Sequence, residues 1–250
     1  MKALSLVFLA VLAAKGIGSL RADGHATESR RLARRLAWLR GVLYAMLLAL
    51  AALGARGVGY DLAAQFYFWA SQDNLAHSDA PRAYANALRA VELRPGVLRY
   101  WQTLARSKFS EQQFASMLED EPAFKSISGG RLEEEDALRF AFAHFFLAEY
   151  DQVILLTRQL VKENRYYAAP YVLEGTTYLN QKKYPEAERC FLAVLQMFPS
   201  QQDAARGLAQ IYFLRGERAR ALAVLNETEK FPFPADARER FRDLKTLYGQ

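Results

Sequence analysis

Cysteine and histidine are scarce in this chain of 250 residues. It has one cysteine, Cys190, and three histidines. A single cysteine excludes an intrachain disulfide and any metal site built from several thiolates. His25, His77 and His144 do not show the spacing of a metal-ligand set. We therefore expect no structural metal and no cofactor.

Catalytic groupings are also lacking. Cys190 follows Arg189 in a helical segment, which favours a small packing thiol over a nucleophile. Gly129-Gly130 lacks the Lys-Ser/Thr of a phosphate loop and is interpreted as a turn. The acidic run Glu133–Asp136 points in several directions on a helix, so it indicates a helix start rather than a cation site. We expect no enzyme and no small-molecule substrate.

Glycine and proline are few, at 14 and 8 residues, and they fall between periodic segments. Strand-like alternation with hairpin turns is not sustained anywhere. Helix starts are indicated at Ser78–Pro81, at Glu133–Asp136 and at Ser200–Asp203, where polar side chains suit unpaired N–H groups. The sequence predicts an all-α fold.

Excess charge is confined to one end of the chain. The net charge is +6, from 33 Lys and Arg against 27 Asp and Glu. Residues 1–55 carry eight of the basic and two of the acidic residues, so the remaining 25 of each leave residues 56–250 neutral. This distribution disfavours a phosphate-binding face, and we expect no nucleic acid partner. A basic nucleic-acid arm is the alternative that it leaves open.

A period of 34 residues dominates the rest of the chain. It relates Ala141 to Gly175 and Ala209, and also Tyr150 to Tyr184. A period of this length is typical of stacked helical hairpins. Small residues such as Gly175 and Ala187 let two helices approach closely where they cross. Bulky residues supply the apolar area between hairpins: Tyr171, Tyr178, Tyr184 and Phe191.

Residues 168–201 resemble a tetratricopeptide repeat (TPR). The resemblance rests on the pattern Tyr171-x2-Glu174-Gly175-x2-Tyr178, followed by Tyr184-x2-Ala187, Phe191 and Pro199. Glu174 departs from it, because the family usually has Leu there. The resemblance implies a right-handed superhelix, an α-solenoid of TPR hairpins.

Weaker copies flank this repeat. Residues 202–235 keep Tyr212 and Gly216 but have Arg218 in place of an aromatic, and residues 134–167 keep Tyr150 while His144 replaces an aromatic. In the latter position we expect a partly buried, hydrogen-bonded histidine rather than a catalytic base. Degenerate copies at about 64–97 and 98–131 slip by two residues around Ser128-Gly129-Gly130.

These observations divide the chain into five segments. Residues 1–36 are a basic N-terminal segment, 37–55 a transmembrane anchor and 56–133 degenerate hairpins; 134–235 hold three repeats, at 134–167, 168–201 and 202–235. Residues 236–250 form a capping helix, with Phe241, Leu244 and Leu247 on its apolar face.

The anchor is predicted from an uncharged stretch at residues 41–55, extended upstream by Ala37-Trp38-Leu39. A buried core helix is the alternative. A single Arg56 begins the downstream flank of this stretch. Five arginines lie on its upstream flank: Arg30, Arg31, Arg34, Arg35 and Arg40. Lysine and arginine favour the cytoplasmic side, so the asymmetry orients the helix. We expect the anchor and the Arg30–Arg40 cluster to contact membrane lipid.

Residues 1–20 are open to three interpretations: a cleaved signal, a second membrane helix and an interfacial segment. A cleaved signal would leave the arginines outside, against the positive-inside tendency. The other two place 21–40 in the cytoplasm and the repeats outside. Together with an Ala/Leu/Arg-rich composition, they indicate a bacterial inner-membrane protein with a cytoplasmic basic segment and a periplasmic TPR domain.

The resemblance implies that the first helix of each repeat lines a concave groove for a protein or peptide partner. The groove candidates are Arg139, Phe142, Phe146, Val172, Thr176, Asn180, Arg206, Gln210 and Phe213. Phe142, Phe145 and Phe146 are equally compatible with filling the junctions between repeats. The Lys/Asn/Arg pattern that clamps a C-terminal carboxylate in some family members is not reproduced.

The predicted function is a membrane-anchored adaptor or scaffold, within a bacterial envelope assembly. A constitutive subunit of a larger membrane complex, held by its anchor or its convex face, is the alternative. An accessory enzyme is a remote one.

Overall fold

The computed structural model describes residues 39, 42–43, 46, 56–232 and 235–249. The chain divides into two compact units, Met1–Ala63 and Ala64–Gln250. The predicted basic segment lies outside the described residues, as does nearly all of the predicted anchor. Within the described part, no helix combines the length and the apolar character needed to cross a membrane. The first unit is described mainly through the start of helix α3 (Arg56–Ala76).

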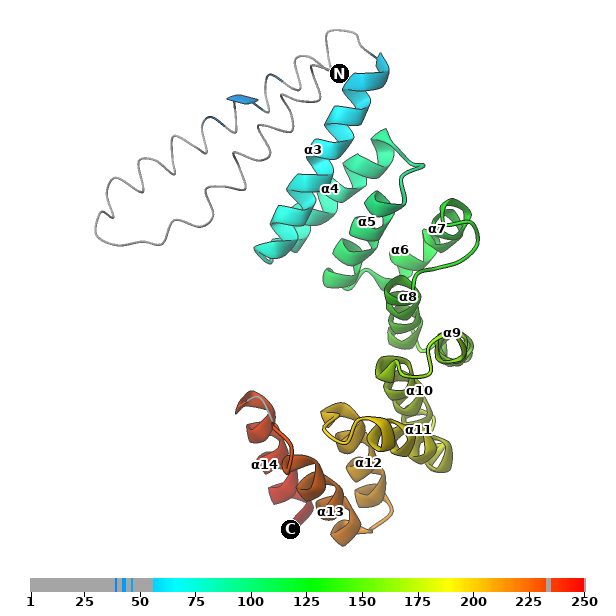
Figure 1. Cartoon of the computed structure of the whole chain (residues 1–250), viewed down its shortest axis with the longest axis vertical. Coiled ribbons are helices and arrows are strands. Elements are labelled where there is room, and N and C mark those ends of the chain that lie inside the picture. Colours follow the sequence, from blue (N-terminus) through cyan, green and yellow to red (C-terminus); the bar gives the residue numbers. More distant parts are fainter. Residues whose placement is uncertain (1–38, 40–41, 44–45, 47–55, 233–234, 250) are drawn as a thin grey trace, which may run out of the picture. The chain divides into compact units, whose positions relative to one another are not determined.

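The second unit is all-helical in its described residues, so the predicted fold class is confirmed there as a TPR-like solenoid. Figure 1 shows its helices following one another in chain order. After α3 they are α4 (Ala80–Leu93), α5 (Leu98–Ser110), α6 (Phe114–Glu119), α7 (Glu121–Ile127), α8 (Glu134–Phe146), α9 (Tyr150–Glu163), α10 (Ala168–Asn180), α11 (Tyr184–Met197), α12 (Gln202–Leu214), α13 (Arg218–Glu229) and α14 (Ala235–Gly249). The handedness of the superhelix stays a prediction.

The 34-residue period reappears in the helix boundaries. The first helices α8, α10 and α12 begin at Glu134, Ala168 and Gln202, each 34 residues after the one before. The second helices α9, α11 and α13 follow the same step. From α8 to α14 each helix packs against the next, and α10 also packs against α8 and α12. Every hairpin therefore depends on its neighbours for part of its buried surface.

The slip in the period has a local cause. The connection from α7 to α8 runs from Ser128 to Glu133, which makes it two residues longer than the Asn164–Tyr167 connection of the next hairpin. Gly129 and Gly130 have φ of 73° and 87° in it, values that glycine adopts without strain. Pro122, which lacks an N–H, marks the first turn of α7 and accounts for the division of this second helix into α6 and α7.

A phenylalanine is wedged between two helices at the centre of the best repeat. Phe191 of α11 is 1% exposed and lies against Gly175 of α10 and Gly207 of α12. A Cβ built on Gly175 would come within 2.8 Å of the ring, and one on Gly207 within 2.4 Å. The predicted close approach at Gly175 is thus present, and Gly207 has the same role on the next hairpin.

The capping helix differs in one residue from its predicted apolar face. Phe241 and Tyr248 of α14 are buried, whereas Leu247 is largely exposed. Seven residues make nearly two helical turns, so Phe241 and Tyr248 share a face, and Leu247, one residue earlier, points away from it. The prediction of Leu247 as a packing residue was wrong, and Tyr248 takes that position.

Each hairpin turn contains one residue in the left-handed region. Ala148, Lys182 and Gly216 have φ of 60°, 60° and 79° at equivalent turn positions. The N–H of the residue that follows each of them closes the turn, as Lys183 N does to the Tyr178 carbonyl at 2.9 Å. This is a Schellman-type helix end, which favours glycine.

Replacing Lys182 by glycine should therefore stabilise the protein by about 0.5–1 kcal/mol, because glycine carries no Cβ penalty at positive φ. Gly216→Ala, the reverse change in the next hairpin, should destabilise it by a similar amount. Urea unfolding of both variants checks the pair. A loss of stability in Lys182→Gly would contradict the turn geometry.

Candidate functional site

The predicted groove residues lie on the first helices α8, α10 and α12. Phe142, Thr176 and Gln210 are equivalent positions in successive hairpins, and so are Val172 and Arg206. Arg139 is out of register with them. Its equivalents are Leu173 and Gly207, which are both buried, so the structure does not bring Arg139 onto the same strip of surface.

Arg139 belongs to a buried ion-pair network. Its side chain is 11% exposed and lies 2.6 Å from both Asp136 and Glu135. Gln102 of α5 donates to Asp136 at 2.9 Å, which links α5 to α8. The charge of Arg139 is therefore neutralised within the fold and is not available to a partner.

Phe213 fills a junction at the C-terminal end. Its ring stacks on Tyr248 of α14 with centroids 4.5 Å apart, and the Arg218 guanidinium lies 5.9 Å from its centroid. The capping helix thus covers this candidate.

The remaining candidates on α10 and α12 form a mostly polar strip. Asn180 and Gln210 are exposed, and Arg206 is held by Asp203 at 2.9 Å with both side chains in solvent. Thr176 is partly exposed and its hydroxyl donates to the Val172 carbonyl at 2.8 Å. These two helices offer amide and hydroxyl groups but no unpaired charge among the candidates.

Phe142 and Phe146 belong to an aromatic cluster of α5, α6 and α8, defined here as Phe109, Phe114, Phe142, Phe145 and Phe146. Phe114 and Phe146 are stacked with centroids 4.4 Å apart, and Phe109 meets Phe142 edge-on at 6.3 Å. Phe146 remains 55% exposed. The cluster fills the junction and also presents ring surface to solvent, so both sequence interpretations apply.

Sequence reasoning missed Phe109 and Phe114 because they lie in a degenerate copy. Phe109 becomes visible once the two-residue slip is allowed for, since it is then the equivalent of Phe145.

One repeat position carries a buried polar side chain in several successive hairpins. It is occupied by Lys108, His144, Tyr178 and Tyr212. Lys108 lies 2.5 Å from Asp120, the Tyr178 hydroxyl accepts from Arg158 at 2.9 Å, and the Tyr212 hydroxyl donates to Glu188 at 2.9 Å. The two tyrosine contacts join a first helix to the second helix of the preceding hairpin, whereas Lys108 pairs with Asp120, between α6 and α7 of its own hairpin.

His144 is the member of this series whose ordinary pKa lies near neutral pH. It is buried, its Nδ1 lies 2.6 Å from Glu149, and its Nε2 lies 3.6 Å from Glu121. Burial lowers the pKa of His144, but the contacts with the Glu121 and Glu149 carboxylates together outweigh burial, and the net pKa is raised. The nearby His144 lowers the pKa of Glu121 despite partial burial. The site is a packing histidine paired with carboxylates.

The stability that His144 contributes should depend on pH. A raised folded pKa gives stability that is fully present below the unfolded pKa and is lost as pH rises through the folded pKa. Glu121 has a lowered pKa, so its contribution is retained above its ordinary range. We expect His144→Gln to lose roughly 1 kcal/mol more at about pH 6 than at about pH 9. Urea unfolding at both pH values measures this, and a pH-independent loss would contradict a charged histidine.

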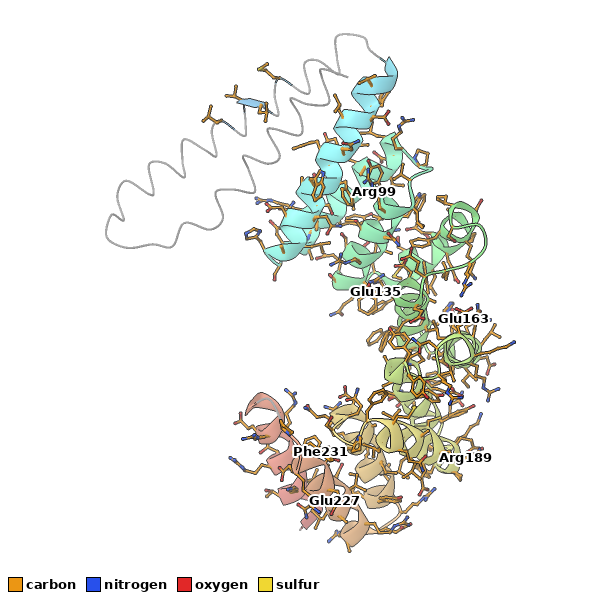
Figure 2. All side chains as sticks on the ribbon, in the orientation of Figure 1. Arg99, Glu135, Glu163, Arg189, Glu227 and Phe231 are labelled. Atoms are coloured by element: carbon orange, nitrogen blue, oxygen red, sulfur yellow. The ribbon has the colours of Figure 1, made fainter. Side chains whose placement is uncertain are left out.

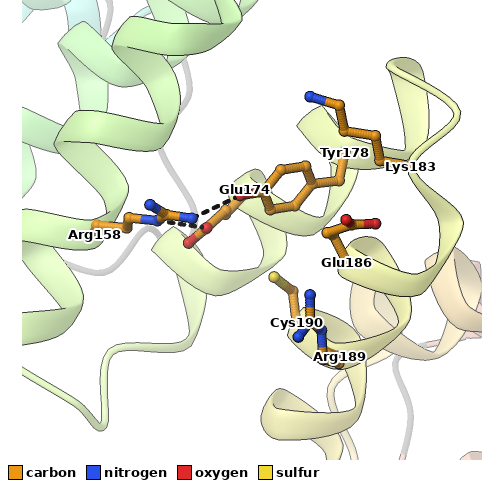
Figure 3. Close-up of a pocket in the computed structure, with 7 residues that line it drawn as sticks. All are labelled: Arg158, Glu174, Tyr178, Lys183, Glu186, Arg189 and Cys190. Atoms are coloured by element: carbon orange, nitrogen blue, oxygen red, sulfur yellow. Dashed lines mark hydrogen bonds and ion pairs between the residues drawn. The ribbon is translucent and has the colours of Figure 1, made fainter.

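Glu174, the departure from the repeat pattern, lies in an open hollow of about 520 Å³ between α9, α10 and α11. Figure 3 shows Arg158 reaching towards Glu174 and Tyr178 across it; the Arg158 Nε lies 3.3 Å from the Glu174 carboxylate. Burial, together with the charge of Glu174, raises the pKa of Cys190 to about 12. Cys190 is therefore a protonated packing thiol, as its sequence context favoured.

Comparison with known proteins agrees with this geometry. Residues 172–237 match the family described as tetratricopeptide repeat. These residues are similar to tetratricopeptide repeats. The match covers the TPR hairpins α10–α11 and α12–α13, whose small and aromatic landmarks are best kept, and ends in the first residues of α14.

Solved TPR structures extend the fold similarity further along the chain. A thermophilic TPR protein of Thermus thermophilus is 18% identical, with a TM-score of 0.56 over 72% of this chain and 98% of its own. PilF of Pseudomonas aeruginosa is 16% identical, with a TM-score of 0.57 over 76% of this chain and 90% of its own. YrrB, a TPR protein with an unusual peptide-binding site, is 15% identical, with a TM-score of 0.52 over 71% of this chain and 90% of its own. No curated protein sequence matches the chain. The fold of the described residues is therefore similar to that of these solved structures.

Proposed function

We propose that the chain is a membrane-anchored adaptor that binds a protein or peptide partner on the first-helix face of its TPR hairpins, without catalytic activity. The observation that carries this proposal is the pairing of a TPR fold with exposed, chemically varied side chains on α8, α10 and α12. The exposed ring of Phe146 on α8 and the exposed amides of Asn180 and Gln210 on α10 and α12 suit a bound peptide or helix. YrrB, which has the same fold, has a peptide-binding site.

The anchor and the compartment are part of the same proposal. They are supported by the uncharged residues 41–55, by the five arginines at Arg30–Arg40 and by the neutrality of residues 56–250. The proposed arrangement is an inner-membrane anchor with a cytoplasmic basic segment and a periplasmic repeat domain. Its assembly would be one of the bacterial envelope.

Site-specific photo-crosslinking tests the binding face. A crosslinking amino acid placed at Thr176 or Gln210 in the full chain, in intact membranes, should yield a discrete partner adduct. Leu155 of α9 and Leu192 of α11, exposed on second helices, are matched control positions. Adducts from the controls alone would remove the first-helix face from consideration.

A constitutive subunit held by its second helices is the other candidate. It is favoured by the exposure of Leu155 and of Tyr166, which follows α9. In that case Leu155 and Leu192 should give the adducts and substitutions on the first helices should be silent.

The topology is tested separately. Reporter fusions after residue 28 and at the C-terminus should be active in opposite compartments, with the C-terminal reporter outside the cytoplasm. Two reporters in one compartment would refute a single crossing.

A further inference from the structure

An unpaired arginine lies beside the exposed aromatic cluster. Arg106 of α5 is exposed, and its guanidinium has no partner in the part of the chain that the structure describes. It precedes Phe109 by three residues, so the two side chains share a face of α5. Allowing for the longer α7–α8 connection, Arg106 occupies the position of Phe142 in the next hairpin. A free cation and exposed ring surface therefore adjoin.

The other cations of this region differ in how they are held. Arg139 and Lys108 are neutralised by carboxylates within the fold. Arg99, nearly two turns before Arg106 on α5, stacks over Phe68 and Tyr100 at 5.3 Å and has no carboxylate partner among the described residues. Helix α5 contains no acidic residue to balance Arg99 and Arg106. Neither arginine is therefore paired with a carboxylate of its own helix.

We propose that the aromatic cluster and Arg106 form a binding site for a partner segment that carries an apolar side chain next to carboxylates. The rings would receive the apolar side chain, and Arg106, supported by Arg99, would pair with the acidic residues. The site lies on the degenerate hairpins of α5 to α8, ahead of the best-kept repeats. This inference rests on the proposed binding function and names the chemistry of its partner.

The C-terminal hairpins are a poorer site for such a segment. On α12, Phe213 is covered by Tyr248, and Arg206 is held by Asp203. On α10 the exposed candidate is Asn180, which has no charge. Among the described first helices from α5 to α12, free cation and exposed rings coincide at α5–α8 alone.

Peptide binding tests the proposal on the full chain in mild detergent. The probes are three fluorescein-labelled 12-residue peptides. The acidic phenylalanine peptide has two phenylalanines among Asp and Glu residues, and the lysine peptide has the same phenylalanines among Lys residues. The third peptide has alanines in place of the phenylalanines, among Asp and Glu residues. The acidic phenylalanine peptide should bind at least about tenfold more tightly than either of the others. It should also weaken as salt increases, because exposed charge pairs are screened.

Variants assign the binding to the site. Arg106→Glu should lower affinity for the acidic peptide about tenfold or more and raise affinity for the lysine peptide, and Phe146→Ala should weaken both phenylalanine peptides. Arg189→Glu on α11 changes another exposed arginine (Figure 2), and Tyr166→Ala changes another exposed aromatic residue; both should leave binding unchanged. Thermal melting by circular dichroism shows that each variant is folded.

The outcomes separate this inference from the function on which it rests. Absence of binding, equal binding of the acidic and lysine peptides, or an effect of Arg189→Glu equal to that of Arg106→Glu would overturn the acidic–apolar site. Partner adducts at Thr176 or Gln210 would still support the adaptor in that case. Absence of both peptide binding and first-helix adducts would overturn both.

Discussion

Replacing Gly207 by alanine should lower the free energy of unfolding by about 2 kcal/mol or more. In most helices the same change is stabilising, by roughly 1 kcal/mol, because alanine is the better helix former. Here the added methyl group would lie 2.4 Å from the Phe191 ring. The ring cannot move away, because Gly175 packs against its other side, where a Cβ placed on Gly175 would lie 2.8 Å from the ring. Thermal and urea unfolding measure the loss.

A smaller side chain at position 191 provides the control. In a Phe191→Leu background the clash is relieved, so Gly207→Ala should cost much less than it does alone, or even stabilise. The double-mutant cycle isolates the steric contact from helix propensity. Additive effects of the two changes would show that the ring is not wedged between the two glycines.

The sequence predicted the hairpins best at positions where two helices approach so closely that only small side chains fit. Gly175 and Ala187 fall at a helix crossing that only small side chains allow, so the period reveals them directly. Gly207 was not predicted, because it aligns with Leu173 and Arg139 and breaks the pattern of the other copies. Position 207 requires glycine because the ring of Phe191, one helix earlier, occupies the space that a Cβ would fill.

The candidate site was less predictable, because exposure depends on what covers each position. Phe142 and Phe213 look alike in the sequence, yet Phe213 is stacked on the capping helix and Phe142 meets Phe109 in an open cluster. Arg139 and Arg206 also look alike in the sequence. Each has an aspartate three residues before it, and only the structure shows that one pair is buried.

Whether a pair is buried determines what its loss should cost. Arg139→Met keeps the length of the side chain and removes its charge, which leaves Asp136, with 5% of its side chain exposed, without its cation. An uncompensated buried carboxylate is strongly unfavourable, so we expect a loss of about 3 kcal/mol. Arg206→Met is the matched control, since its pair with Asp203 has the same spacing but exposures of 46% and 58%. It should cost about 0.5 kcal/mol or less.

The comparison also decides how binding experiments on this protein should be designed. Asp136→Asn added to Arg139→Met removes the stranded charge and should recover part of the lost stability. Equal losses in Arg139→Met and Arg206→Met, measured by urea unfolding, would contradict the buried network. If the network holds, a loss of partner binding in any Arg139 variant reports a weakened α5–α8 junction, whereas the same loss in an Arg106 variant reports contact with the partner itself.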